Sequence, residues 1–272
     1  MAIKSHAFAG TALQAVLLGL GSFTAVGLTG VSTSHAQEAK PTGSFVENFD
    51  KFDRSRWFIS DGWVAGDHQN CTWSKGQVRV KDGVLRLGFA KAESGERAYV
   101  CGEVQSKQRY SYGTYEVRMK AASGPGLDQG FFTYIGPNDK QPWDEIDFEV
   151  LGKDPSQVQL NYYVDGKGSH EQLVPVPGSA EAGFNDYAFV WEKDRLRWYV
   201  NGELVRTAED PAGLPSHASK IFMSIWGSDK LRSWLGTFAE PSGPLTLEVD
   251  RVAFTALGDA CQFPESVACN LD

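Results

Sequence analysis

Three acidic residues alternate with apolar residues along residues 143–150, which read Trp-Asp-Glu-Ile-Asp-Phe-Glu-Val. On a β-strand, Glu145, Asp147 and Glu149 would share one face while the apolar side chains face the core. Three carboxyl groups this close cannot all ionise freely, so the pKa of at least one should rise. A protonated acid beside an ionised nucleophile is the pair that glycoside cleavage requires. The alternative is a solvated outer face of an edge strand.

The spacing of the two glutamates leaves the stereochemistry of such a reaction open. Their Cα atoms lie roughly 13 Å apart on a strand that rises ~3.3 Å per residue, but long side chains can lean toward each other. A retaining glycosidase needs carboxyl groups ~5–5.5 Å apart, and an inverting one needs ~6.5–9.5 Å. Asp147 stands between Glu145 and Glu149 and can hydrogen-bond to either. Trp143 precedes the acids and no Lys or Arg interrupts them, which argues against a merely solvated face.

The rest of the chain predicts strands that would position this acidic row. Turn residues separate short segments rich in β-branched and aromatic residues. Lys81-Asp82-Gly83 and Asn201-Gly202 are hairpin signals. We predict no helix of ten or more residues and no βαβ alternation, so the fold class is all-β, an antiparallel sandwich or barrel. The predicted strands are residues 78–80, 84–89, 113–119, 130–135, 157–164, 187–192, 195–200, 220–226 and 245–254.

The start of the chain predicts export. Residues 1–36 combine Lys4, an uncharged run over 7–31, and small residues flanking a cleavage site before Gln37, which is typical of a secretory signal peptide. An uncleaved membrane anchor is the alternative, because the run is long enough to span a bilayer. Residues 37–43 are polar and predict a flexible mature N-terminus, and residues 44–272 predict one catalytic domain. We expect a secreted protein, extracellular or periplasmic.

The composition of the chain indicates which classes of partner it could bind. Of 272 residues, 34 are acidic and 26 basic, which gives a net charge of −8. This charge and the lack of a basic cluster argue against binding to nucleic acid or to an anionic membrane. Aromatic residues make up 12% of the chain, with eight Trp, which suits stacking on flat apolar ligand faces. We expect a monomer whose partner is a polysaccharide substrate.

Four cysteines allow three disulfide pairings. Cys261 and Cys269 would close a short loop near the C-terminus, so we predict that they pair with each other. Cys71 and Cys101 then remain as the second pair and would tie two distant loops. A four-thiol zinc site is the alternative, which the predicted export disfavours.

The acidic motif Glu-Ile-Asp-Phe-Glu resembles the Glu-x-Asp-x-Glu signature of glycoside hydrolase family 16. The similarity covers about residues 44–261 and is closest to bacterial lichenases in residues 143–154. A second set of segments resembles rhizobial succinoglycan depolymerases, which are secreted endo-1,3-1,4-β-glycanases of the same family. The lichenase-like segments are 61–63, 70–73, 113–116, 131–137 and 161–163, and the depolymerase-like segments are 185–192, 249–254 and the Cys261/Cys269 pair.

The resemblance implies a β-jelly roll with a substrate cleft on its concave sheet, and a retaining double displacement. It implies Glu145 as the nucleophile, Glu149 as the acid and base, and Asp147 as the residue that tunes and orients the pair. No cofactor is implied for catalysis. No extra residue separates Asp147 from Glu149, which matches the lichenase-like branch rather than enzymes that cleave pure 1,3-linked glucans. The implied substrate is a 1,3-1,4-linked β-glycan, with succinoglycan as the expected polymer.

The resemblance also implies the residues along the cleft. Sugar rings stack their apolar faces on aromatic side chains, while polar groups fix their hydroxyls. Three other tryptophans, Trp57, Trp191 and Trp198, lie inside apolar strand patterns, so we expect them in the core. The predicted substrate-binding residues are Trp63, Glu103, Gln105, Phe132, Tyr134, Trp143, Asn161, Tyr163 and Trp226.

Three positions depart from the lichenase pattern. Lichenases have Asn, Arg and Asn where this chain has Ala65, Gln105 and Ser224. These changes remove hydrogen bonds to an unsubstituted glucan and open room. They favour a branched or acylated bacterial polysaccharide over plain cereal β-glucan.

Lichenase-like proteins often hold a structural calcium on the convex side. The matching positions are the carbonyls of Asn48 and Gly83 and the carboxylate of Asp250. Calcium takes six to eight oxygen ligands, so this set predicts a weak site; the alternative is that Asp250 is a simple strand-end acid. Three histidines in polar loops are expected on the surface: His68, His170 and His217.

Two other functions stay open. A non-catalytic carbohydrate-binding jelly roll would share the fold, but the intact acidic row argues against it. A transglycosylase would pass the same glycosyl-enzyme intermediate to another sugar, which the sequence does not separate from hydrolysis.

Overall fold

The computed structural model describes residues 43–92, 97–209 and 213–271. The predictions for residues 1–36 and 37–42 lie outside these residues. Every described element belongs to one unit over residues 40–272. Within the described residues, no helix has the length and hydropathy needed to cross a membrane.

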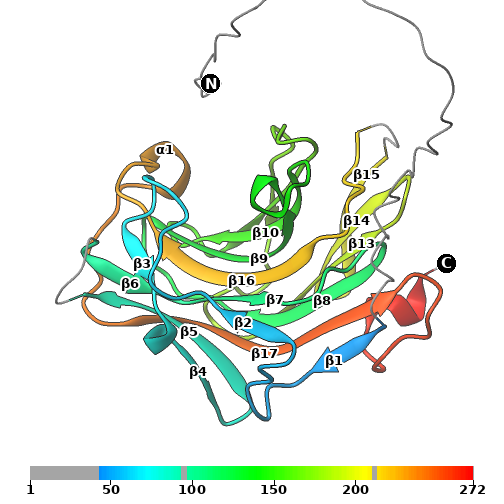
Figure 1. The fold of residues 1–272 in the computed structure, drawn as a ribbon, viewed down its shortest axis with the longest axis horizontal. Helices are drawn as coiled ribbons and strands as arrows, with labels where there is room; N and C mark the ends of the chain where they lie inside the picture. The colour runs from blue at the N-terminus through cyan, green and yellow to red at the C-terminus, as the bar shows by residue number, and fades with distance from the viewer. Residues whose placement is uncertain (1–42, 93–96, 210–212, 272) are drawn as a thin grey trace, which may run out of the picture. The chain divides into compact units, whose positions relative to one another are not determined.

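The acidic row lies in a sheet of seven strands, in the order β12-β11-β10-β9-β16-β7-β2. All of its strand pairs are antiparallel. Figure 1 shows this sheet curving upward at both sides, so we call its upper side the concave face. Its strands are β2 (Trp57–Ile59), β7 (Glu103–Ser106), β9 (Leu127–Ile135), β10 (Asp144–Leu151), β11 (Gln157–Tyr163), β12 (Gln172–Pro175) and β16 (Lys220–Gly227).

The second sheet has ten strands, in the order β15-β14-β13-β8-β17-β5-β6-β3, with β1 on β17 and β4 on β5. Only the β3–β6 pair is parallel among the pairs described. Its strands are β1 (Phe45–Glu47), β3 (Cys71–Trp73), β4 (Val78–Lys81), β5 (Val84–Lys91), β6 (Tyr99–Cys101), β8 (Gly113–Lys120), β13 (Asn185–Trp191), β14 (Leu196–Val200), β15 (Glu203–Ala208) and β17 (Leu245–Ala256). The short helical pieces are η1 (Lys75–Gln77), η2 (Pro137–Asp139), α1 (Arg232–Leu235) and η3 (Val267–Asn270).

The core lies between the two sheets, as expected when two sheets each bury one face. Aromatic rings meet across it: Phe148 lies 5.4 Å from Tyr187, and Phe131 lies 6.0 Å from Phe189. The prediction of an all-β antiparallel sandwich is therefore confirmed. The predicted core tryptophans are also confirmed, since all three are fully buried: Trp57, Trp191 and Trp198.

Each predicted strand is present, with ends that differ by a few residues. The two hairpin predictions are confirmed by backbone geometry, because Asp82, Gly83, Asn201 and Gly202 all have positive φ. The largest difference is in β9, which begins at Leu127 rather than 130. This extension brings Asp128 into the sheet.

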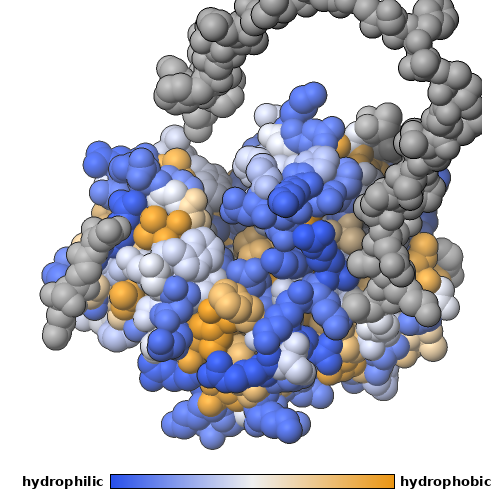
Figure 2. Space-filling view, in the orientation of Figure 1, coloured by the Kyte–Doolittle hydropathy of each residue, from blue (hydrophilic) through white to orange (hydrophobic). Residues whose placement is uncertain are grey.

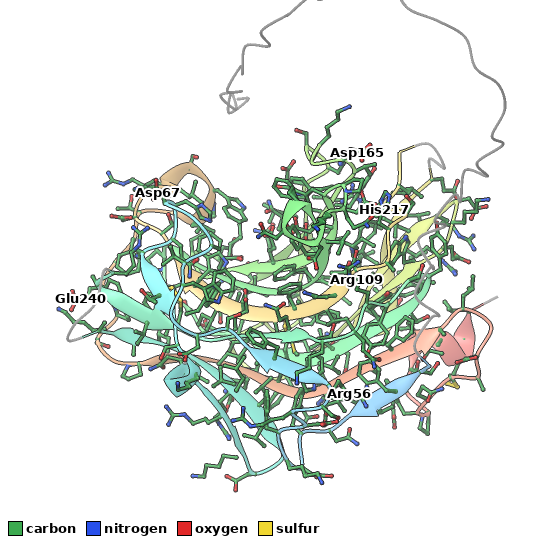
Figure 3. The ribbon with its side chains drawn as sticks, in the orientation of Figure 1. Arg56, Asp67, Arg109, Asp165, His217 and Glu240 are labelled. Carbon is green, nitrogen blue, oxygen red and sulfur yellow. A yellow bond between two sulfur atoms is a disulfide. The ribbon has the colours of Figure 1, made fainter. Side chains whose placement is uncertain are left out.

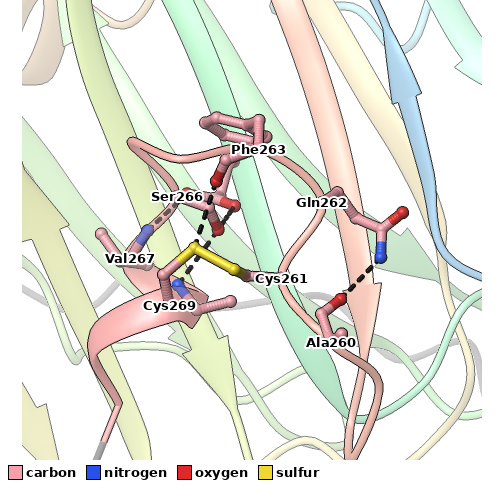
Figure 4. The surroundings of a disulfide bond; sticks show 9 residues. Ala260, Cys261, Gln262, Phe263, Ser266, Val267 and Cys269 are labelled. Atoms are coloured by element: carbon pink, nitrogen blue, oxygen red, sulfur yellow. Dashed lines mark hydrogen bonds between the residues drawn. A yellow bond between two sulfur atoms is a disulfide. The ribbon is translucent and has the colours of Figure 1, made fainter.

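Both predicted disulfides are confirmed. Cys71–Cys101 joins β3 to the neighbouring strand β6. Cys261–Cys269 closes the C-terminal segment, where the backbone N–H of Cys269 donates to the carbonyl of Ser266 (Figure 4). Ser266 Oγ donates to the Glu116 carboxylate at 2.6 Å, which fastens this segment to β8 of the ten-stranded sheet.

Candidate active site

The acidic row is arranged as its alternation predicts. The apolar side chains of β10 are fully buried in the core, while Glu145 and Glu149 are half-buried on the other side of the strand. Asp147 lies between them and is 2% exposed. Since β10 is an inner strand flanked by β9 and β11, the acids do not form the solvated face of an edge strand. The three carboxyl groups therefore line the middle of the concave face.

Aromatic residues enclose the Glu145 end of the row. Tyr134 on β9 and Tyr163 on β11 are its two neighbours in the strand register. The Trp143 indole N–H donates to Glu145 Oε2 at 2.6 Å, and its ring stacks on Tyr163 at 4.9 Å. Trp143 also meets Tyr134 edge-on at 6.1 Å. Glu145 therefore has a fixed donor and flat apolar platforms around it.

The Glu149 end has different neighbours. Its neighbour on β9 is Gly130, which has no side chain, and its neighbour on β11 is Gln159. Gln159 already accepts a hydrogen bond from the Trp234 indole at 2.7 Å. No hydrogen bond to the Glu149 carboxyl is found among the described residues. Among these residues, the hydrogen-bonding capacity of the Glu149 carboxyl is therefore unfilled.

Burial and mutual repulsion perturb the titration of all three acids. Burial raises the pKa of Glu145 to about 7, although the Trp143 hydrogen bond opposes this shift. Burial, with repulsion by Glu145 and Glu149, raises the pKa of Asp147 well above its usual value. Burial, with repulsion by neighbouring acids, likewise raises the pKa of Glu149 well above its usual value. The prediction that at least one pKa rises is confirmed, and Glu145 is the acid with a donor that favours its charged form.

The strand register brings most of the predicted substrate-binding residues to the same face. Phe132 lies opposite Asp147 on β9 and Asn161 lies opposite it on β11. Across β16, Gln105 and Glu103 of β7 extend the face away from the acids. Ser60 Oγ donates to Glu103 at 2.5 Å, and burial raises the pKa of Glu103 to about 7.

The loop that carries Trp63 borders this face rather than belonging to the sheet. Trp63 is 42% exposed and packs on Trp73 with ring centroids 6.2 Å apart. His68 of the same loop contacts Trp226 at 5.3 Å, so the loop lies beside the Trp226 end of β16. Figure 3 shows Asp67 of this loop and Asp165 rising on opposite sides, and in Figure 2 the surface is notched between these two parts.

Sequence reasoning missed one acid on this face, Asp128. It shares the face of β9 with Gly130, Phe132 and Tyr134, because alternate residues of a strand point the same way. It is 3% exposed, and burial raises its pKa to about 7. The signal that could have found Asp128 is the same alternation, because Asp128 lies one two-residue period before residue 130, the predicted start of the strand.

The three histidines expected on the surface, His68, His170 and His217, are partly exposed, and each contacts a neighbouring side chain. His217 Nδ1 lies 2.8 Å from a carboxylate oxygen of the buried Asp144, which also accepts from the Ser216 and His217 backbone. His170 stacks on Tyr162 at 3.9 Å.

The proposed calcium ligands are brought to one place. β17 pairs with β5 up to Val249 and with β1 from Val252 onward. Asp250 therefore lies beside the two residues that border these strands, Gly83 before β5 and Asn48 after β1. Arg118 Nε lies 3.5 Å from the Asp250 carboxylate, so the one acidic ligand is already paired. No group of three His, Cys, Asp or Glu side chains suited to a metal ion is found in the described part of the chain. The positions fit weakly, and calcium stays a prediction that the unfolding temperature with and without EDTA tests.

Comparison with known proteins agrees with this geometry. The family model of glycosyl hydrolases family 16 matches residues 65–242. Endo-1,3-1,4-beta-glycanase ExoK from Rhizobium meliloti is 60% identical over 229 residues, which are 84% of this chain and 85% of that protein. The Bacillus licheniformis beta-glucanase structure has a TM-score of 0.75 at 39% identity and covers 79% of this chain and 99% of its own. A lichenase from a mouse hindgut metagenome has a TM-score of 0.76 at 38% identity and covers 79% of this chain and 100% of its own. The predicted jelly roll is confirmed.

Proposed function

The chain belongs to glycosyl hydrolase family 16 and is a glycoside hydrolase, and we propose that it is a secreted, retaining endo-β-glycanase that cleaves a 1,3-1,4-linked β-glycan. The observation that carries this proposal is the acidic row of β10. It holds the buried Asp147 between the half-buried Glu145 and Glu149 on the concave face, beside aromatic residues, and the pKa values of all three acids are perturbed.

The reaction uses the two ends of the row differently. In the first step, Glu145 attacks the anomeric carbon and forms an ester to the sugar, while Glu149 gives its proton to the departing glycosidic oxygen. In the second step, Glu149 takes a proton from water, the water oxygen bonds to the anomeric carbon, and the ester to Glu145 breaks. Two inversions give net retention of configuration.

The surroundings of the two glutamates support these roles. A nucleophile must be ionised, and the Trp143 N–H stabilises the charge of Glu145. An acid must keep its proton, and the acids around Glu149 oppose its ionisation. Asp147 lies between the two and, when protonated, can donate a hydrogen bond to either. Both pKa values are raised, but only Glu145 has a donor that favours its charged form, so Glu145 ionises at lower pH than Glu149.

The proposed polymer is succinoglycan, a branched and acylated bacterial polysaccharide. The relative from Rhizobium meliloti is named an endo-1,3-1,4-beta-glycanase. Ser224 and Gly130 are neighbours in the register, so the face between Glu149 and Glu103 has small side chains at its centre. That leaves room for a substituted sugar.

The substrate is tested by incubating the purified protein with succinoglycan, lichenan and laminarin and sizing the products. We expect short oligosaccharides from succinoglycan at the highest rate, with lower rates on lichenan and little release from laminarin. Products larger than the starting chains, seen when acceptor sugars are added, would indicate transglycosylation instead. Intact succinoglycan beside cleaved lichenan would contradict the polymer and leave the reaction class standing.

Export and assembly complete the proposal. Residues 1–36 act as a signal peptide, and residues 44–272 are the catalytic domain, which works as a monomer. The two disulfides suit an oxidising compartment. N-terminal sequencing of protein recovered from the periplasm or medium should begin at Gln37, and size-exclusion chromatography should give the monomer mass.

A further inference from the structure

A fourth acid of the concave face, Asp128, has no part in the reaction described so far. It lies on β9, opposite Leu151 of β10 on one side and Trp226 of β16 on the other. Its position follows from the strand alternation that also places Phe132 and Tyr134 on this face. Asp128 is therefore a carboxyl group of the same surface as the acidic row.

Asp128 is a near neighbour of Glu149. Glu149 is paired in register with Gly130, and Asp128 is the next residue on that face of β9. Such diagonal neighbours lie about 7–8 Å apart at Cα, within reach of longer side chains. Gly130 lies between them on this face and has no side chain, and the Asp128 charge is the largest of the neighbouring charges that oppose ionisation of Glu149.

The carboxyl groups of Asp128 and Glu149 differ in the hydrogen-bond donors around them. The Trp226 indole and the Gln129 backbone N–H favour the charged form of Asp128, although burial opposes it and raises the pKa of Asp128 to about 7. Its Oδ1 atom is buried and has no partner among the described residues. Glu149 has no comparable donor there, so Asp128 should ionise before Glu149.

The charged groups around Glu149 are acidic. β9 contributes Asp128, β10 contributes Glu145 and Asp147, and the segment before β12 contributes Glu171. β11 faces it with the neutral Gln159, and β16 presents the neutral Trp226 toward Asp128. Of the acids that act on Glu149 from other strands, Asp128 is buried and Glu171 is exposed, so the charge of Asp128 is screened less by solvent.

We propose that Asp128 is a positioning residue that holds the proton on Glu149, because a negative charge across Gly130 opposes ionisation of the acid. The inference rests on the proposed role of Glu149 as the proton donor. Without Asp128, Glu149 would lose its proton at lower pH. The rate of the first chemical step would then begin to fall at a lower pH than in the unaltered enzyme.

The test is the pH profile of kcat/KM for Asp128→Asn. The alkaline limb, which reports loss of the Glu149 proton, should move to lower pH by about one unit, the size expected for removal of a neighbouring charge. The variant Asp128→Glu, which keeps the charge, should restore the limb to higher pH. KM at the pH optimum should change little, because the residue acts through Glu149. A rise in KM with an unmoved alkaline limb would instead assign Asp128 to sugar binding and overturn the proposal.

Glu171→Gln is the matched control, because it removes one acid that also acts on Glu149 but is exposed. Its alkaline limb should move less than that of Asp128→Asn; equal shifts would contradict a short-range role for Asp128. Glu149→Gln distinguishes failure of the proposed function from failure of the Asp128 inference. If it keeps wild-type activity, the proposed function fails; if it is inactive while Asp128→Asn has the wild-type profile, only this inference fails.

A measurement on the unaltered enzyme covers the case in which Asp128 variants do not fold. Carboxyl groups labelled with ¹³C can be titrated individually by NMR. We expect Asp128 to ionise at lower pH than Glu149, and the Glu149 resonance to respond when Asp128 ionises. The reverse order, or no response, would overturn the proposal.

Discussion

Two glutamates occupy the middle of inner strands on opposite outer faces of the sandwich: Glu116 on β8 and Glu149 on β10. Burial raises the pKa of both. Glu116 accepts hydrogen bonds from Ser266 Oγ at 2.6 Å and from the Val267 backbone at 3.0 Å, and the Arg251 charge also favours its ionised form. Glu149 has no such donors among the described residues.

The difference separates a structural acid from a reactive one. Both carboxyl oxygens of Glu116 accept hydrogen bonds, and these bonds hold the C-terminal segment on the ten-stranded sheet. Glu149 lies among other acids that oppose its ionisation, as its proposed role as the proton donor requires. A raised pKa alone therefore does not identify a catalytic carboxyl; unfilled hydrogen-bonding capacity in addition marks a candidate.

The comparison predicts its largest effect at Glu149. Glu149→Gln removes the proposed proton donor and should lower kcat/KM on a polysaccharide by about 10²–10⁴-fold, the usual contribution of a general acid. Reducing-end release measures this loss. Glu116→Gln is the control and should keep its activity per folded molecule. Equal losses in the two variants would break the distinction between the two sites.

The next effect is on stability. Glu116→Ala leaves Ser266 Oγ and the Val267 N–H without their acceptor, which should lower the free energy of unfolding by about 1–3 kcal/mol. Thermal or urea unfolding measures it, with Glu149→Ala as the matched variant. Glu149→Ala should keep or raise the stability, because it removes a half-buried acid that lies among like charges. Greater destabilisation by Glu149→Ala would contradict the structural assignment.

A smaller effect is expected at the other end of the acidic row. Trp143→Phe keeps the ring that stacks on Tyr163 but removes the N–H that favours ionised Glu145. The pKa of Glu145 then rises, so the acidic limb of kcat/KM should move to higher pH by about one unit. If the acidic limb stays in place while the variant still binds substrate, the Trp143 N–H does not control the ionisation of Glu145.

The smallest effect is on the pH dependence of stability. The folded-state pKa of Glu145 is raised to about 7, so its contribution to stability is fully present below its unfolded pKa and is lost as the pH rises through about 7. Asp147, Glu149 and Asp128 are shifted in the same direction. The unfolding temperature should fall by a few degrees between mildly acidic and mildly alkaline pH. Asp147→Asn should flatten this decline; a steeper decline would contradict it.

Local sequence signals predicted much of the fold and the centre of the site. The period-two alternation located β10 and the direction of its acids, and the Asn201-Gly202 and Asp82-Gly83 turns located two hairpins. These features depend on residues adjacent in the sequence. The short distance from Cys261 to Cys269 likewise predicted their pairing.

The features missed depend on partners that are far apart in the chain. Asp144 and His217 are 73 residues apart, and Glu116 and Ser266 are 150 apart, so neither contact has a local signal. Asp128 was missed because pairing with β10 and β16, rather than local propensity, sets where β9 begins. Tertiary pairing therefore decides the outer parts of the site, while local alternation decides its centre.

The central claim is that the acidic row carries a double displacement through Glu145. The most direct test treats Glu149→Gln with an aryl β-glycoside whose leaving group needs no protonation, then digests the protein and analyses it by mass spectrometry. The first step should proceed and the second should be slow, so a glycosyl ester should accumulate on the peptide that contains Glu145. An adduct on another residue, or inverted product with no adduct at all, would contradict the account.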